Sequence, residues 1–468
     1  MDRLGYRTLL LAGTLLSAGL AAALVPTGAS AESLADAMVR AYQTSPLLDA
    51  NRAALRSLDE SVPQARAGRR PQVSATIGAS SSTTSENFQD DRLDSVQAQL
   101  EATLVLFDSG ATKAAIESAR NQVAAGRADL KDVEQLVLFN AVQAYVDVRR
   151  DEEFVRLASN DVERLDETLR ATQNRFDVGE VTRTDVSQSQ SRYAASRSQL
   201  ESARGALEVS RQTFRQAVGS LPGDLEPLPP LPPLPKTVDE ALSIGMQRNP
   251  TIISAQFSER AAVYDFDRAR AAKGPSIGVS AGFGPERTNQ FGWNTDVGVS
   301  ASITGSMPLY TGGNNDSVIR QAQSLLDQRR FQLQDEGRSV TQAVAAAWSQ
   351  VDVARANIVA RREQAEAARI AAEGVAEEAR LGARSTLDVL DADQERLQAE
   401  AEIVQAVRDE YVAAYSLLRA MGLLTVEHLK LGIETYNPDV YFTKVQSGPS
   451  GGYDTKAVDR IRARWERN

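Results

Sequence analysis

Two aspartates three residues apart, Asp388 and Asp391, are the side chains whose type and spacing most suggest chemistry. Residues with this spacing share one face of a helix. If rotational symmetry repeated that face around an axis, the carboxylates would form a ring, and such rings select cations in channels. The competing interpretation is that Asp388 caps a helix that begins after Ser385, and that Asp391 is a solvated surface charge. Capping and lining are compatible for Asp388, so the spacing alone leaves both interpretations open.

The other reactive residue types do not form a catalytic or metal-binding set. The chain has one histidine, His428, and no cysteine, so neither a Ser/His pair with nearby partners nor a thiolate site can be built. The run Gly312–Asn315 lacks the Lys-Ser/Thr ending of a phosphate loop and is more typical of a turn. The net charge of −10 argues against nucleic-acid binding. We therefore expect no enzyme activity, no cofactor, no metal and no nucleic-acid partner.

An internal repeat organises the chain and carries these aspartates. Residues of the first half recur at an offset of 204 residues early in the repeat and 203 later. A repeat of this length indicates a duplicated structural half, because solenoids and propellers have periods of about 20 to 50 residues. We expect a pseudo-symmetric fold with structural repeats at 32–221 and 236–425. Recurring residues include Ala37, Pro46, Pro71, Gly179 and Asp185, which return as Ala241, Pro250, Pro275, Gly382 and Asp388.

Three segments lie outside the repeats. Residues 1–31 combine early arginines, an apolar run and a small-x-small ending, which predicts a signal peptide and an exported chain. Residues 222–235 are rich in proline and predict a semi-rigid extended linker. Residues 426–468 form a C-terminal extension. After residue 31 no apolar stretch approaches the ~20 residues of a membrane-spanning helix.

Long proline-free spans in both repeats predict very long helices. Small apolar residues recur there at heptad spacing, which lets helices approach closely. The helix that begins after residue 110 would run about 65 residues, or ~100 Å, and its counterpart begins after residue 313. Gly179 and Gly382 supply the backbone conformation that ends a helix. Each repeat should therefore form a helical hairpin whose tip turn lies at its glycine.

Before each long helix the sequence changes to strand periodicity. Apolar and polar residues alternate along about 95–107 and 295–309, and each segment follows a partner strand, at about 72–84 and 276–284. Four strands per chain are expected. In a soluble protein such a pair would be a half-buried hairpin packed on helices. The strand length, the export signal and the polar segments between the strands favour outer-membrane strands instead.

Four strands cannot close a barrel, and an open sheet edge cannot face lipid because its backbone groups would lack partners. Three chains would supply twelve strands, enough for a lumen open to water. We expect an α+β membrane protein in which a trimeric 12-stranded β-barrel continues into a long α-helical coiled-coil barrel. The alternative is a non-channel helical envelope spacer or adhesin. It would explain the heptads and the export, but not two paired strand sets at matched repeat positions.

Short motifs mark the strand-to-helix junctions and the hairpin tips of both halves. The junctions are Leu106–Gly110 and Pro308–Gly313, and the tips are Arg175–Gly179 followed by Thr184–Val186, and Leu381–Gly382 followed by Leu387–Ala392. These motifs resemble those of the TolC family of outer-membrane efflux and secretion channels. The resemblance spans roughly residues 32–425, in two halves with matching spacing.

This resemblance implies a homotrimeric tunnel in the outer membrane that crosses the periplasm and exports proteins or small molecules. The implied partners are outer-membrane lipid, a periplasmic adaptor of the membrane fusion protein type, and an inner-membrane transporter of the ABC or RND type. Asp388 and Asp391 would line the periplasmic entrance. The C-terminal extension is more similar to tails of type I protein secretion channels than to those of drug-efflux lipoproteins.

The resemblance also implies a gate at the periplasmic tips. Arg384 would pair with Thr184 or Asp185 of the first-half tip, and release of that pair would let the inner hairpin swing outward. Ala379 stands where the family often has an aromatic residue, so one expected gate contact is missing.

Overall fold

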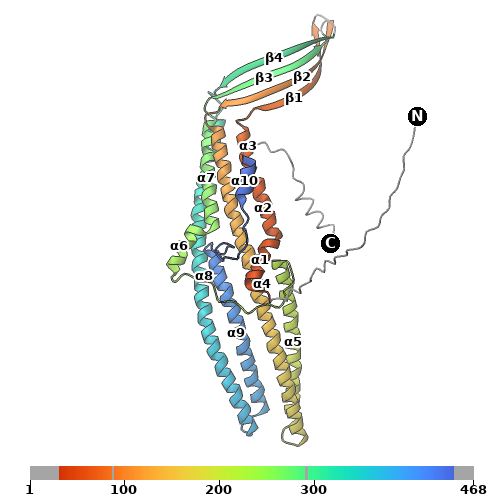
Figure 1. Ribbon diagram of the computed structural model, residues 1–468, viewed down its shortest axis with the longest axis vertical. Helices are drawn as coiled ribbons and strands as arrows, with labels where there is room; N and C mark the ends of the chain where they lie inside the picture. Colours follow the sequence, from red (N-terminus) through yellow and green to blue (C-terminus); the bar gives the residue numbers. More distant parts are fainter. Residues whose placement is uncertain (1–30, 87–88, 290–292, 447–468) are drawn as a thin grey trace, which may run out of the picture.

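The computed structural model describes residues 31–86, 89–289 and 293–446. Residues 1–30 of the predicted signal peptide and 447–468 of the C-terminal extension lie outside these ranges. The molecule is elongated, with a four-stranded sheet at one end and two long helical hairpins that extend to the other (Figure 1). The shorter helices lie beside the long ones between the sheet and the middle of the molecule.

Two hairpins of nearly equal size form the helical part. In the first, α4 (Ala111–Asp177) is followed by α5 (Arg183–Val218); in the second, α8 (Asn314–Arg380) is followed by α9 (Thr386–Ala420). Each outgoing helix has 67 residues, so it spans about 100 Å. Gly179 and Gly382 both have a φ of +82°, in the left-handed region that ends helices and favours glycine.

Six shorter helices complete the described helical part. The first three precede the first hairpin, the next two precede the second, and α10 follows the second hairpin. The pieces α2 and α3 pack along α4, while α7 lies between α4 and α8. Their bounds are α1 Leu34–Thr44, α2 Pro46–Asp59, α3 Ser61–Ala67, α6 Val238–Arg248, α7 Pro250–Ala271 and α10 Pro438–Gln446.

The sheet is antiparallel and has the order β1-β2-β3-β4. Its first two strands lie before α4 and its last two before α8, so the sheet joins segments far apart in the sequence. β2 and β3 connect the two halves, for example through the pair Leu100↔Phe283. The strand bounds are β1 Gln72–Glu86, β2 Gln89–Phe107, β3 Ser276–Thr288 and β4 Asn294–Ser306.

The strand ends differ from the sequence expectation in three ways. β3, expected to end near residue 284, continues to Thr288. β1 and β2 continue into the polar segment expected to be a loop, because the two strands stay paired in register as far as Glu86↔Gln89. The strand expected to reach residue 309 stops at Ser306. Pro308 follows two residues later, and its missing N–H disfavours a longer strand.

The main core lies at mid-height, where the two hairpins meet the short helices. The heptad residues of α4 are buried there, including Ala141 and Val148, and they pack with Leu417 and Leu418 of α9. Tyr145 is fully buried, and its hydroxyl donates to the carbonyl oxygens of Glu32 at 2.9 Å and Glu226 at 2.8 Å. This hydroxyl therefore holds the start of the first repeat and the linker that follows it against α4.

Across the described residues, the helices are too polar for any of them to qualify as a membrane span.

Candidate functional site

One face of the sheet is apolar and the other is polar. The strand register places the apolar side chains of all four strands on a common face, as in Ala75↔Leu100 and Phe283↔Val299. Several of these side chains are far more exposed than a soluble protein would leave them: Ile77 83%, Val299 80% and Ile303 75%. A contiguous exposed apolar surface of this kind marks a site of membrane or protein contact. The opposite face carries Gln97, Gln99, Glu101, Thr103, Ser300 and Ser302.

The sheet has two free edges. Within the described part of the chain, β1 pairs only with β2 and β4 only with β3. The unpaired N–H and C=O groups of each outer edge can bind another strand. An apolar face that ends in two open edges requires further strands before it can enter lipid.

The helical tips are two copies of one local design. In each, the last turn of the outgoing helix is closed by the glycine, whose N–H donates to the carbonyl oxygen of Phe176 at 2.9 Å or of Ala379 at 3.1 Å. The returning helix then begins with a capping box, Thr182 with Asp185 or Ser385 with Asp388. The residues of each cap are close together in the sequence, so their motifs are sufficient to locate the tips.

The two capping aspartates carry stabilised negative charge. The backbone N–H and the hydroxyl of Ser385 donate to Asp388 at 2.9 and 2.8 Å, and these hydrogen bonds lower the pKa of its carboxyl. At the other tip, the hydroxyl of Thr182, with its backbone N–H, lowers the pKa of Asp185 in the same way. Both carboxylates are accordingly ionised at neutral pH.

Asp391 has a different environment from Asp388. Its Oδ1 accepts a hydrogen bond from Nη2 of Arg192 on α5 at 2.6 Å, although both side chains remain partly exposed. Two residues further along α9, Asp393 pairs with Arg164 of α4. Arg164 also binds Asp161 of its own helix at 2.7 Å. The first turns of α9 are thus held to both helices of the first hairpin by arginines that the sequence patterns did not single out.

The expected gate residues lie at the tips but do not meet within one chain. Arg384 donates from Nε to Glu378 of its own tip at 2.8 Å, and this contact raises its pKa. Thr184 is exposed on the first turn of α5, beside the capping Asp185. The pairing of Arg384 with the first-half tip stays a prediction.

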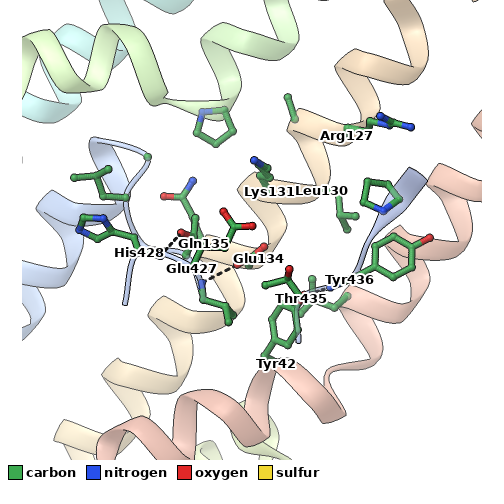
Figure 2. A pocket seen from close by; sticks show the side chains of 18 of the residues that line it. Tyr42, Arg127, Leu130, Lys131, Glu134, Gln135, Glu427, His428, Thr435 and Tyr436 are labelled. Carbon is green, nitrogen blue, oxygen red and sulfur yellow. Dashed lines mark hydrogen bonds between the residues drawn. The ribbon is translucent and has the colours of Figure 1, made fainter. Parts of the chain in front are cut away.

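A cavity of about 1390 Å³ lies at mid-height between α2, α4, α7 and the segment that follows α9 (Figure 2). Two hydrogen bonds hold that segment in place: Glu134 accepts from the backbone N–H of Val426 at 2.9 Å, and the Tyr42 hydroxyl accepts from that of Tyr436 at 3.0 Å. Burial raises the pKa of Glu134. His428 lies at the cavity wall, where its backbone N–H donates to the Thr425 hydroxyl at 3.2 Å. No group of three or more potential metal ligands occurs among the described residues.

Comparison with known proteins places this architecture in one family. The family model described as "Outer membrane efflux protein" matches residues 37–220 and 241–423. The chain is 33% identical over 441 residues to the outer membrane efflux protein BepC of Brucella suis biovar 1, covering 93% of this chain and 94% of BepC. It is 24% identical to the outer membrane protein TolC of Escherichia coli, covering 86% and 85%.

A solved structure has the same fold. The outer membrane protein VceC of Vibrio cholerae superimposes with a TM-score of 0.71, at 20% identity, covering 83% of this chain and 96% of VceC.

Proposed function

The chain belongs to the TolC-like outer membrane efflux protein family, and from that premise we propose that it is one of three identical subunits of an export duct. The family consists of outer-membrane channel proteins rather than enzymes. In the proposed duct, cargo enters at the periplasmic tips, passes along the helices and leaves through a twelve-stranded barrel. The cargo class is proteins, small molecules or both.

One observation carries this proposal: the sheet combines an exposed apolar face with two free edges. Three copies joined edge to edge would pair every strand and turn the apolar face toward lipid. The polar face would then line a water-filled lumen. The long hairpins continue from this sheet and would form the periplasmic wall (Figure 1).

We propose that the periplasmic entrance is lined by Asp388 and Asp391 of each chain. Threefold symmetry would bring these carboxylates around the axis, where ionised groups favour cations. Arg384, paired across the tips with Thr184 or Asp185 of the first hairpin, would help to keep the entrance closed. Each exposed pair contributes about 0 to 1 kcal/mol, so only the combined copies can bias a gate.

We propose partners for this duct because a passive duct needs other proteins to deliver its cargo. A periplasmic adaptor of the membrane fusion protein type would contact the tips, and an inner-membrane transporter of the ABC or RND type would supply the energy. The structure of the chain offers no nucleotide-binding loop of its own in the described residues.

The test is single-channel conductance of the purified full-length protein in a planar bilayer, with a trivalent cation added to each side in turn. We expect cation-selective pores of low conductance that are blocked from one side only. The Asp388→Asn/Asp391→Asn variant should lose the block. A protein that never inserts would support the envelope spacer instead, and a block that is equal from both sides would remove the entrance assignment.

A further inference from the structure

The apolar face of the sheet carries a charged residue at its end away from the helices. Arg287 of β3 pairs with Val96 of β2, and this register places it on the apolar face. Its side chain is exposed, and within the described strands β3 and β4 it is the one charged side chain of that face. A guanidinium on a lipid-facing strand is costly at mid-membrane and tolerated near the interface. Arg287 should therefore lie at the level of lipid headgroups.

The length of the apolar face agrees with that level. The stretch from Ile277 to Arg287 has eleven residues, and a tilted strand needs about 9 to 11 residues to cross the hydrocarbon. Exposed aromatic side chains lie at both ends, as in the belts at membrane interfaces. Phe107, which pairs with Ile277, is 48% exposed and Tyr310 is 89% exposed, while Trp293 at the end away from the helices is 52% exposed (Figure 1).

Arg287 is positioned by an aromatic ring and not by an acid. Its guanidinium lies over the ring of Trp293, 5.2 Å from the centroid. Among the described residues no carboxylate forms an ion pair with it. The end of β3 is fixed by Asn289, whose Oδ1 accepts from the backbone N–H of Asp94 at 2.7 Å and whose Nδ2 donates to that carboxylate at 3.3 Å. The donors of Arg287 are therefore available to an anion from outside the chain.

We propose that Arg287 and Trp293 bind the phosphate-bearing headgroup of a lipid in the outer leaflet of the outer membrane. The planar guanidinium can donate two parallel hydrogen bonds to phosphate oxygens. The indole ring offers an apolar surface beside the acyl chains and an N–H at the interface. This inference rests on the proposed function, because that function turns the apolar face toward lipid.

The test is a titration of the purified protein, in a non-ionic detergent, with lipid A, a phosphorylated lipid of the outer leaflet. The chain has three tryptophans, so Trp348→Phe combined with Trp465→Phe leaves Trp293 as the one fluorescent reporter. In this parent protein we expect lipid A to bind about tenfold more tightly than dephosphorylated lipid A. Inorganic phosphate at the same concentration should not displace it, because free phosphate lacks the apolar contact of the acyl chains.

Three variants of the parent protein make the test specific. Arg287→Gln should remove the preference for the phosphorylated lipid. Arg287→Lys should keep part of it, since an ammonium keeps the charge but not the fork of donors. Arg260→Gln is the matched control, because Arg260 also lies 5.2 Å from an aromatic ring, that of Phe257, but on α7 outside the sheet. It should bind both lipids as the parent protein does.

Each contrary outcome identifies what has failed. Equal affinity of the parent protein for the two lipids would overturn the site, and so would an unchanged preference in Arg287→Gln. Displacement by inorganic phosphate at the same concentration would overturn the lipid assignment and leave a site for free anions. A protein that forms no pore but needs Arg287 to bind lipid A would refute the duct and support the lipid contact. A protein that forms pores, and whose Arg287→Gln variant keeps the preference, would refute this inference alone.

Discussion

The two helical hairpins have nearly the same backbone but very different surroundings. Both outgoing helices have 67 residues, and both tips use a left-handed glycine and a capping box. α4 lies in the centre of the chain, covered by α2, α5, α7 and α9, whereas α8 lies at its edge. The same helical design is therefore covered by other helices in one position and partly uncovered in the other.

The edge position leaves apolar side chains of α8 uncovered. Phe331 is 68% exposed, Val359 58% and Ile370 57%, although the heptad residues Val340, Val344 and Val351 of the same helix are buried. An apolar surface of this kind on a long helix indicates contact with another helix. We infer that α8 packs against a helix of a neighbouring copy, as α4 packs against helices of its own chain.

The largest expected effect comes from disrupting the proposed contact of α8 with a neighbouring copy. Val359→Glu combined with Ile370→Glu would place carboxylates in the proposed contact between copies, at a cost of about 3 kcal/mol or more per copy if they become buried. We expect the trimer to be replaced by folded monomers, measured by sedimentation in detergent. Gln332→Glu, which adds a carboxylate at an exposed polar position of the same helix, should leave the trimer intact. A trimer that survives the double change would show that this part of α8 faces solvent.

The contrast also predicts unequal costs for two aromatic residues. Tyr145 of α4 is fully buried and Trp348, which stands 203 residues later on α8, is only partly buried. Tyr145→Ala should lower the free energy of unfolding by about 3 to 5 kcal/mol, through a cavity and two lost hydrogen bonds. Trp348→Ala should cost roughly half as much in a monomer. Equal losses in urea unfolding would contradict the distinction between core and edge.

The free energy of unfolding should depend on pH through a buried carboxyl group of the first half. Asp59 at the end of α2 is fully buried, and burial raises the pKa of its carboxyl to about 6 despite Arg127 nearby; Arg56, Glu60 and Asp439 also act on it. The folded state then binds the proton more tightly than the unfolded state. Stability should rise as pH falls through 6 and fall as pH increases, by roughly 1 kcal/mol between pH 8 and pH 5.

The second half has no carboxyl group at the matching position, because Val263 stands 204 residues after Asp59. α7 runs through that position without the interruption that separates α2 from α3. Asp59→Asn should therefore flatten this part of the pH profile of the unfolding temperature. A profile unchanged by the substitution would assign the dependence to other groups.

The smallest expected effect concerns the tips, where the two hairpins agree. A Cβ at Gly179 or Gly382 would meet no atom within 4 Å, so the cost of Gly→Ala is the left-handed backbone alone. We expect about 1 kcal/mol at each tip, and the same value at both. Gly205→Ala and Gly374→Ala, which lie inside helices, should be neutral or stabilising. Unequal tip values in denaturant unfolding would reveal a contact made by one tip only.

The sequence predicted the features that depend on local signals. A few consecutive residues determine each of these features. They are the helix starts after residues 110 and 313, the glycine turns and the capping boxes. The sequence does not predict the polar ends of β1 and β2, because residues 85–86 and 89–94 are nearly all polar or charged and do not alternate with apolar residues. Pro308 follows the end of β4, but the apolar residues on both sides of it favour a longer strand.

The arginine links could not be predicted from patterns. Arg192 and Asp391 are 199 residues apart, and their contact depends on how α5 and α9 are rotated toward each other. The sequence identified Asp391 as a lining residue or a solvated surface charge, and neither interpretation gave it an arginine partner. A spacing of three residues fixes which face two side chains share, but it does not identify what lies opposite that face.

The Tyr145 hydroxyl also bears on the order of events during synthesis and export. It joins Glu32 to Glu226, and a short parallel bridge between Glu32 and Leu225 lies beside it. All of these groups precede α6, α8 and α9 in the chain. A chain that emerges from its amino end can therefore close this loop while the second hairpin is still being delivered. The closed first half is then ready as a template on which the later helices dock.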